Sequence, residues 1–112
     1  MIADAIELLV STQNADGGWG ATPERQSDTE TTAVAVMALR AWNTDARPPR
    51  VQRGIAWLLR LQKSDGSWPI RHDVEDSSWA TALAVLCLAS FDEHRRRAQA
   101  GARWLLEQRG RG

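Results

Sequence analysis

Residues 6–42 of this chain recur 49 positions further along without a gap, and this internal repeat limits the possible folds more than any other feature. The most distinctive matched pairs are Gln13 with Gln62, Asp16 with Asp65, Gly17 with Gly66, and Trp19 with Trp68. The aromatic composition is skewed in the same sense, since there are six Trp, one Phe and no Tyr. A fixed period of this length is typical of repeat proteins, in which each unit buries its apolar face against its neighbour. We therefore expect stacked copies of one structural unit.

A third copy begins near the C-terminus, where Gly101-Ala-Arg-Trp104-Leu-Leu resembles Gly54-Ile-Ala-Trp57-Leu-Leu of the second copy. Gln108 then follows one position early, and the Asp-Gly-x-Trp segment is missing after it. A length of 112 residues is that of a single domain. Within it we expect repeat one at about 1–49, repeat two at about 50–94 and a partial repeat three at about 95–112.

Each complete unit predicts two helices of different character. The first helix of copy two places Ile55, Leu58, Leu59 and Gln62 at positions i, i+3, i+4 and i+7, the pattern of an amphipathic helix. The second helix is apolar all round, so we expect it to be buried on every face. The predicted helices are Ile2–Asn14, Asp28–Trp42, Val51–Lys63, Ser77–Phe91 and Arg95–Gln108, with linkers at Asn43–Pro49 and Asp92–His94.

The expected fold is all-α, with helical hairpins of the α/α-toroid type that form a partial barrel of about five helices. The amphipathic helices form its outer layer and the fully apolar helices its inner layer. Asp28-Thr29 and Ser77-Ser78 precede the two inner helices and are candidates for their N-caps, because short polar side chains accept hydrogen bonds from the first free N–H groups.

The Gln…Asp-Gly-x-Trp segment connects the two helices of each unit. A Gln side chain both donates and accepts hydrogen bonds, Gly66 suits a tight turn, and Trp68 combines a large apolar ring with one N–H donor. We expect Gln62 and Trp68 to hold neighbouring hairpins together by stacking and hydrogen bonding. In the alternative interpretation, Trp19 or Trp68 binds a ligand.

The segment that runs from Arg53-Gly54 through Trp57-Leu58 and Gln62 to Asp65-Gly66-Ser-Trp68 resembles the QW motif of squalene-hopene cyclases, oxidosqualene cyclases and class II diterpene cyclases. Copy one resembles this motif from Ile6 to Trp19, but has Asp4-Ala5 in place of the basic residue and Gly. The resemblance implies an α/α barrel with terpene-cyclase chemistry. It implies a structural role for six motif residues: Gln13, Gly17, Trp19, Gln62, Gly66 and Trp68.

The same resemblance implies a place for a catalytic acid. Squalene-hopene-type cyclases protonate their substrate with an Asp-x-Asp-Asp-Thr-Ala motif at the start of an inner helix, and the middle acid is the proton donor. The best match here is Asp28-Thr-Glu30-Thr-Thr-Ala33, with Glu30 at the donor position and Thr31 in place of an acid. Asp28 and Glu30 are therefore the catalytic candidates. Alternatively, both residues belong to the first turn of a helix, where negative charge suits the helix dipole.

For two other groups of residues we expect structural roles and no chemical function. His72, Asp73 and Glu75 lack a second His nearby, so a loop and helix-cap role is expected in place of a metal site. Cys87 is the single cysteine and lies among apolar residues, which predicts a core thiol and no disulfide within the chain.

The arginines of the last helix suit either a solvated outer face or an anionic partner: Arg95, Arg96, Arg97, Arg103, Arg109 and Arg111. Over the whole chain, fourteen basic residues balance fourteen acidic ones, which argues against a nucleic-acid partner. The longest apolar run, Ala33–Leu39, is far shorter than the roughly 20 residues that span a bilayer. No basic-then-apolar leader follows Met1. We expect a cytoplasmic protein with no transmembrane segment, cofactor or metal.

A closed barrel of the family that the chain resembles needs about six hairpins, and this sequence has two and an extra helix. We expect the barrel to be completed by further copies of this chain or by another α/α repeat chain, because a repeat unit buries its faces only against neighbours. The expected function is then class II cyclisation of an isoprenoid by a terpene cyclase or mutase. The alternatives are a non-catalytic module that binds an isoprenoid or a protein, and an excised or designed repeat without a function of its own.

Overall fold

A computed structural model describes residues 2–42, 49–77 and 79–110 of the chain. Its helices are α1 (Ile2–Thr12), α2 (Thr29–Trp42), α3 (Pro49–Leu61), α4 (Ala80–Ala89) and α5 (Arg95–Gly110), and a 3-10 turn, η1 (Asp92–His94), lies between the last two. Within the described residues the only β-type pairing is an isolated bridge between Pro69 and Ser77. The prediction of an all-α fold is confirmed.

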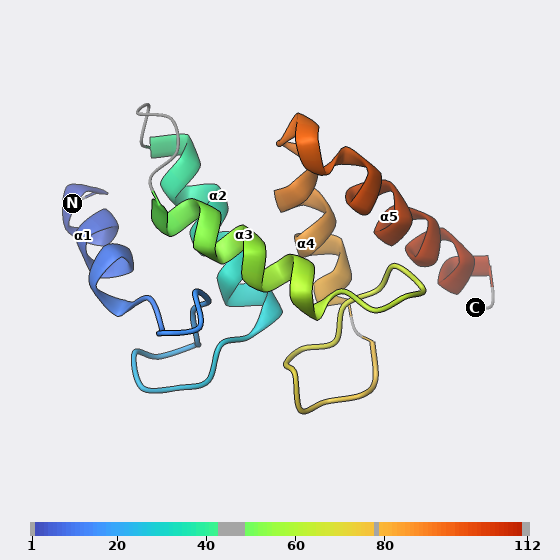
Figure 1. Cartoon of the computed structure of the whole chain (residues 1–112), viewed down its shortest axis with the longest axis horizontal. Helices are drawn as coiled ribbons and strands as arrows, with labels where there is room; N and C mark the ends of the chain where they lie inside the picture. The colour runs from blue at the N-terminus through green and yellow to red at the C-terminus, as the bar shows by residue number, and fades with distance from the viewer. Residues whose placement is uncertain (1, 43–48, 78, 111–112) are drawn as a thin grey trace.

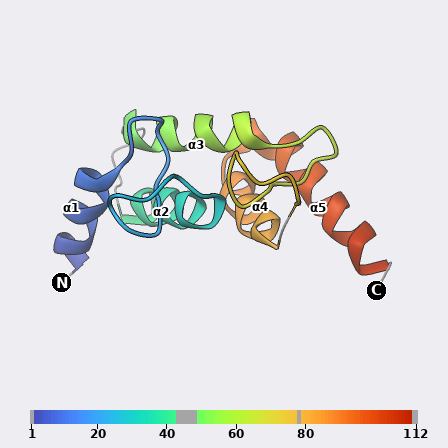
Figure 2. The same ribbon diagram turned by 90° about the horizontal axis from the view of Figure 1, so that it is seen from below.

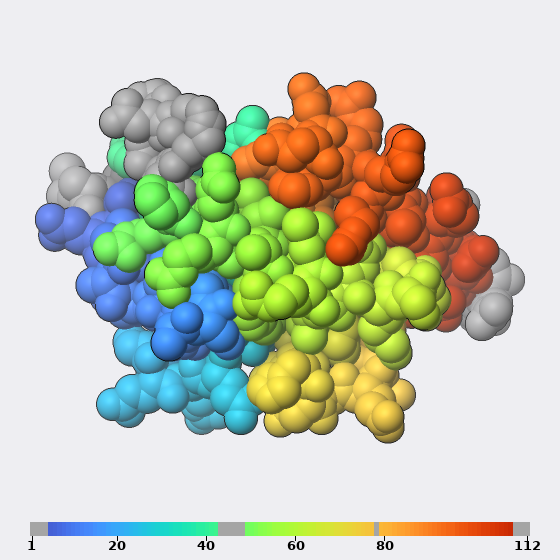
Figure 3. All heavy atoms as spheres, viewed as in Figure 1, coloured from blue at the N-terminus to red at the C-terminus, as the bar shows by residue number. Residues whose placement is uncertain are grey.

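The five helices form two layers. Helices α1, α3 and α5 make an arch, and α2 and α4 lie side by side beneath it (Figure 2). Helices α1 and α5 stand at opposite ends of the long axis of a molecule that measures 43 × 29 × 23 Å (Figure 1). The loops 13–28 and 62–77 lie next to each other on one side of the molecule, below α3 in the space-filling view (Figure 3).

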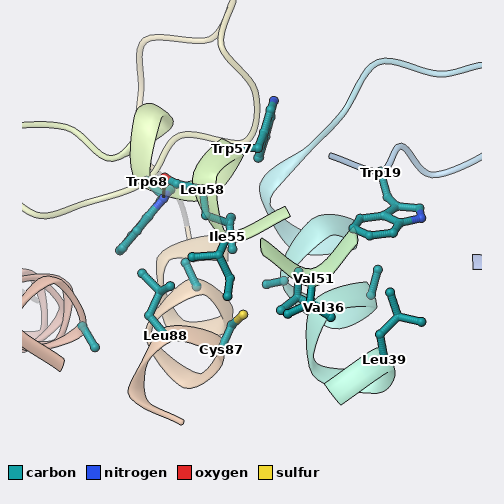
Figure 4. Packing of buried hydrophobic residues seen from close by; sticks show 14 residues of the cluster. Trp19, Val36, Leu39, Val51, Ile55, Trp57, Leu58, Trp68, Cys87 and Leu88 are labelled. Atoms are coloured by element: carbon teal, nitrogen blue, oxygen red, sulfur yellow. Dashed lines mark hydrogen bonds between the residues drawn. The ribbon is translucent and has the colours of Figure 1, made fainter. Parts of the chain in front are cut away.

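The outer helices α3 and α5 each pack on the inner helix that precedes them in the chain, whereas α1 packs on α2, which follows it. Helix α3 packs on α2, α5 packs on α4, and the two inner helices pack on each other. Side chains of α3 reach both inner helices, since Val51 lies beside Val36 of α2 whereas Ile55 and Leu58 point toward α4 (Figure 4). The core is therefore shared between the repeats, and neither hairpin has a separate one.

Local sequence explains most helix ends. Helix α3 begins at Pro49, two residues earlier than predicted, because the fixed φ angle of proline suits the first helical position, where no N–H is required. Helix α4 begins at Ala80 and not at Ser77. The Ser77 hydroxyl bonds to that of Ser67, and its backbone forms the bridge to Pro69, so the prediction of Ser77 as an N-cap is wrong. The linker at 43–48, Ser78 and Arg111 lie outside the described residues.

The prediction that the inner helices are buried on every face is also wrong. Val34 of α2 is 48% exposed and Leu86 of α4 is 61% exposed, although Val36 and Leu88 in the same helices are fully buried. The outer helices cover only one side of α2 and α4, and within the described residues nothing packs on the opposite side. The sequence of each inner helix is apolar on all sides because the helix has two apolar faces. The outer helices of this chain cover one of these faces.

Two glycines let the outer helices approach their neighbours closely. A Cβ atom at Gly54 would stand 2.6 Å from Val36 Cγ2 and 3.0 Å from Trp19 Cζ3. At Gly101 the same distances apply to Val85 Cγ2 and Trp68 Cζ3, one repeat further on. Both distances are too short for any side chain larger than hydrogen, so the two glycines set the spacing between consecutive units.

We predict that Gly54→Ala destabilises the chain by about 1–3 kcal/mol, because overpacking outweighs the gain in helix propensity. Urea denaturation followed by far-ultraviolet circular dichroism measures the change. The control is Gln52→Ala on the exposed side of the same helix, for which a change within about 0.5 kcal/mol is expected. A Gly54→Ala variant as stable as the parent chain would contradict the close approach.

Candidate functional site

The two Gln…Trp segments form equivalent turns, which we call turn one (residues 13–19) and turn two (residues 62–68). Gly17 and Gly66 have φ angles of 98° and 94°, a left-handed conformation that glycine adopts without strain. Their N–H groups donate to the carbonyls of Asn14 at 3.0 Å and Lys63 at 2.9 Å. Both turns therefore reverse the chain by the same geometry.

The glutamine side chain joins its own turn to the next outer helix. Gln13 Nε2 donates to the carbonyl of Gly17 at 2.7 Å and to that of Arg50 in α3 at 3.0 Å. One repeat later, Gln62 Nε2 donates to the carbonyls of Gly66 at 3.0 Å and Arg97 in α5 at 3.1 Å. The amide thus bridges consecutive hairpins, as the sequence indicated.

The tryptophans are buried, with Trp19 at 2% and Trp68 at 0% exposure. Their indole N–H groups donate to the carbonyls of Leu9 and Leu58 in the preceding outer helix, both at 2.8 Å. Each ring lies against the glycine of the following outer helix, so the expected stacking takes the form of ring-on-glycine packing. Because ring and N–H are both occupied within the fold, neither tryptophan has a free face for a ligand.

Two buried threonines complete the turns. Thr32 Oγ1 accepts a hydrogen bond from the backbone N–H of Trp19 at 2.9 Å and donates to its carbonyl at 3.3 Å. Thr81 makes the same pair of bonds with Trp68, at 2.9 and 3.2 Å. The repeat alignment matched these threonines but did not suggest their role, since Thr at the start of a helix has many common uses.

Arginines add a second link between hairpins, at a different position in each copy. Arg53 donates to the carbonyl of Ala15 at 3.1 Å, whereas Arg97 donates to Gln62 Oε1 at 2.9 Å. Gln13 Oε1 is buried and lacks a partner among the described residues. The side-chain amide is therefore more completely bonded in turn two than in turn one.

Aspartates brace the turns from the inside. Asp65 Oδ1 accepts hydrogen bonds from the Ser67 hydroxyl at 2.5 Å and from the Ser67 N–H at 3.0 Å. The hydroxyl bond, followed by the N–H bond, lowers the pKa of Asp65 below its ordinary value of 3.8. In turn one, Asp16 Oδ1 accepts from the Gly18 N–H at 3.0 Å and from the Ser27 hydroxyl at 2.7 Å.

The two catalytic candidates lie at the start of α2 in different settings. Asp28 caps the helix, because Oδ1 accepts from the Thr31 N–H at 2.6 Å and Oδ2 accepts from the Thr31 hydroxyl at 3.0 Å. Glu30 is exposed, and one helical turn later Val34 is exposed on the same side of α2. Thr29 is buried and donates to the carbonyl of Pro69 at 2.6 Å, which ties this helix end to the second loop.

Both inner helices expose apolar side chains, and Val34 among them lies one helical turn after Glu30. We call this exposed part of the inner helices the inner face and define it by four side chains: Val34 and Trp42 of α2, Trp79 at the start of α4, and Leu86 of α4. Trp79 stands in repeat two at the position that Glu30 holds in repeat one, 49 residues earlier. The N-terminal ends of the two neighbouring inner helices therefore differ, because α2 has the acid Glu30 where α4 has the aromatic ring of Trp79.

The remaining candidate groups do not form a reactive centre. Burial raises the pKa of the Cys87 thiol to about 12, against a weaker opposing effect of Arg40, so Cys87 is a core residue as predicted. Asp73 pairs with Arg71 at 3.0 Å. Among the described residues, no three His, Cys, Asp or Glu side chains gather closely enough to hold a metal ion. No described helix has both the length and the apolar character needed to cross a membrane.

Comparison with known proteins adds one finding. The sequence model of the family described as squalene-hopene cyclase C-terminal domain matches residues 1–74, which include turn one, turn two and the start of α2. No curated protein matched the chain.

We predict that Thr81→Val destabilises the chain by about 1–3 kcal/mol, because it removes both hydrogen bonds between the Thr81 hydroxyl and the backbone of Trp68 in a buried place without changing the side-chain volume. The denaturation midpoint in urea reports this loss, provided that the slope of the transition stays constant. Thr22→Val in the exposed part of the first loop is the matched control and should change stability by less than about 0.5 kcal/mol. Equal effects of the two variants would contradict the role of Thr81.

We predict that Ser67→Ala raises the pKa of Asp65 toward 3.8, because it removes the hydroxyl bond that lowers this pKa most. Since the pKa is lower in the folded chain, the ionised carboxylate stabilises the turn above pH 3.8, and this contribution is lost as the pH falls through the lowered pKa. Titration of the Asp65 side-chain carbon resonance measures the change. Ser64→Ala at an exposed neighbouring position should leave the titration unchanged.

Proposed function

Because the chain belongs to the squalene-hopene cyclase C-terminal domain family, we propose that it forms one section of an α/α barrel that cyclises an isoprenoid once further repeats complete it. The proposed reaction is of class II, in which a carboxylic acid protonates an alkene or a related group of the substrate. The barrel supplies an enclosed apolar space, and the inner face is the part of its wall that this chain provides.

The inner face is the observation that carries the proposal. Val34, Trp42 and Leu86 expose apolar surface over helices that are also apolar where they are buried. An isoprenoid chain is apolar throughout, so its transfer from water onto such a surface is favourable by roughly 25 cal/mol per Å² buried. Trp42 and Trp79 add aromatic faces, which attract positive charge as it develops during cyclisation.

Glu30 is the proposed proton donor, and Asp28 its neighbour at the same helix end. Glu30 borders the inner face one turn before Val34, so a substrate lying on that face passes within reach of its carboxyl group. A neighbouring repeat laid over the start of α2 excludes water from this carboxyl group, which strengthens its interaction with a substrate. The catalytic role therefore depends on assembly.

One observation favours a second candidate, a module that binds an isoprenoid or a protein partner without a reaction. Both carboxylate oxygens of Asp28 are engaged with Thr31, which leaves Glu30 as a single acid and not as a member of a carboxylate pair. In this case the inner face binds its ligand in the same way, and Glu30 contributes only negative charge at the helix start.

The two functions are separated by Glu30→Gln, which retains shape and removes the acid. Catalysis by Glu30 predicts a loss of turnover of about 100-fold or more. The assay is incubation with farnesyl, geranylgeranyl and squalene substrates followed by product analysis, at several protein concentrations. Glu24→Gln in the exposed first loop is the control for a lost carboxylate and should retain full turnover. Asp28→Asn keeps a good N-cap, so lost turnover in that variant would not come from an unfolded helix.

Binding of the same substrates is measured in parallel from the fluorescence of the exposed Trp42 and Trp79. Saturable binding without turnover in the parent chain supports the non-catalytic module. Turnover that is equal in the parent chain and in Glu30→Gln excludes Glu30 as the donor, and absence of both binding and turnover excludes the inner face as an isoprenoid surface.

A further inference from the structure

The two end helices carry opposite charge. Helix α1 has the acidic residues Asp4 and Glu7 and no basic residue, whereas α5 has five arginines and a single acid, Glu107. The chain as a whole has a net charge of zero. The charge is therefore divided between ends that stand at opposite sides of the molecule (Figure 1).

Each end also exposes a large apolar side chain. Leu8 of α1 is 60% exposed, whereas Trp57, at the matching position of α3, is 6% exposed because α3 is packed between neighbouring elements. Leu106 of α5 is 62% exposed. Helices α1 and α5 thus each have one side without a neighbouring helix. An apolar side chain is exposed on each of these helices, Leu8 on α1 and Leu106 on α5.

Helix α1 also has a groove that suits a side chain from outside. The groove is shallow and largely open to solvent, has a volume of about 510 Å³ and is lined by Ile6, Glu7, Leu8, Val10 and Ser11. Three of its five residues are apolar, and Glu7 places one negative charge among them. This chemistry fits a helix surface with an apolar side chain next to a cation.

Helix α5 presents such a surface. Arg103 and Leu106 are exposed and three positions apart, so they are neighbours on one side of the helix. Other arginines of α5 are already engaged, since Arg95 pairs with Asp92 and Arg97 bonds to Gln62 Oε1. No ion pair involves Arg103 within the described residues, so its charge is available for a partner.

We propose that the groove of α1 binds the Arg103–Leu106 side of α5 from a second copy of this chain, with Leu106 in the groove and Glu7 facing Arg103. The contact is head to tail, because pairing two α1 helices brings Glu7 against Glu7 and pairing two α5 helices brings Arg103 against Arg103. Repetition of a head-to-tail contact produces open chains or closed rings.

In this assembly the partner that the proposed function requires is a second copy of the same chain. The biological purpose of the assembly rests on the proposed function, but the contact itself does not. Its test needs no turnover, so failure of the assembly and failure of the catalysis are separate results. A contact between two helices is smaller than a standard protein interface, and we expect a dissociation constant on the order of 10–100 µM. Salt weakens the association because an exposed ion pair contributes to it.

Sedimentation velocity over a concentration range around that dissociation constant tests the assembly. The parent chain is expected to grow in mass with concentration beyond two copies. Leu8→Asp and Leu106→Asp are each expected to stay monomeric, whereas Leu86→Asp on the inner face is the matched control and should associate like the parent chain. Circular dichroism and thermal midpoints of all three variants verify that they are folded.

A mixture of the two monomeric variants gives the decisive result. The Leu8→Asp chain keeps an intact α5 and the Leu106→Asp chain keeps an intact α1, so an equimolar mixture should form pairs of two chains and nothing larger. A monomeric parent chain overturns the proposal. Association of either single variant with itself, or loss of association in Leu86→Asp, overturns it as well, since each result requires a different contact.

The charged pair supplies a test that does not depend on burying an aspartate. Glu7→Arg and Arg103→Glu should each weaken association at low salt by about fivefold or more. The chain that carries both substitutions restores opposite charges across the contact and should regain most of the parent affinity. A double variant as weak as either single one would contradict the pairing of Glu7 with Arg103.

Discussion

The contact between a Gln–Trp turn and the following outer helix is the interaction on which the rest of the structure depends. The glutamine amide bonds to a carbonyl in the first turns of that helix, and the tryptophan ring lies against its glycine. Because Gly54 and Gly101 have no side chain, the helix comes close enough to bring Val51 and Ile55 onto the inner layer. The same contact occurs twice, and its repetition produces the arch in Figure 2.

This contact has a direction, which determines how the layers are used. Each turn holds the outer helix that follows it, so α3 covers α2 and α5 covers α4, the inner helix that precedes each of them. Part of the surface of α2 and α4 stays uncovered, and Val34, Trp42, Trp79 and Leu86 are exposed there. The contact between turn and outer helix builds the arch and also leaves the inner face uncovered beneath it. The proposed function uses this face.

The start of α2 shows where motif reasoning reaches its limit. The sequence places Asp28 and Glu30 two residues apart before an apolar helix, but spacing does not say which side chain the backbone engages. In the structure Thr31 donates hydrogen bonds to both carboxylate oxygens of Asp28, whereas Glu30 is exposed one helical turn before Val34. The turn residues were more predictable, because Gly17 and Gly66 need a left-handed backbone and a buried indole N–H needs an acceptor.

The sequence by itself determined the period, the helical character of each segment and the residues of the two turns, because these follow from local backbone preferences and from an unbroken alignment of one copy with the other. Only the tertiary structure decided which faces are covered. A helix such as 82–88 is apolar on all sides, and nothing in its sequence tells whether the neighbour on a given side is α3, α5 or an element beyond this arch. Burial is a property of neighbours and not of the segment that they cover.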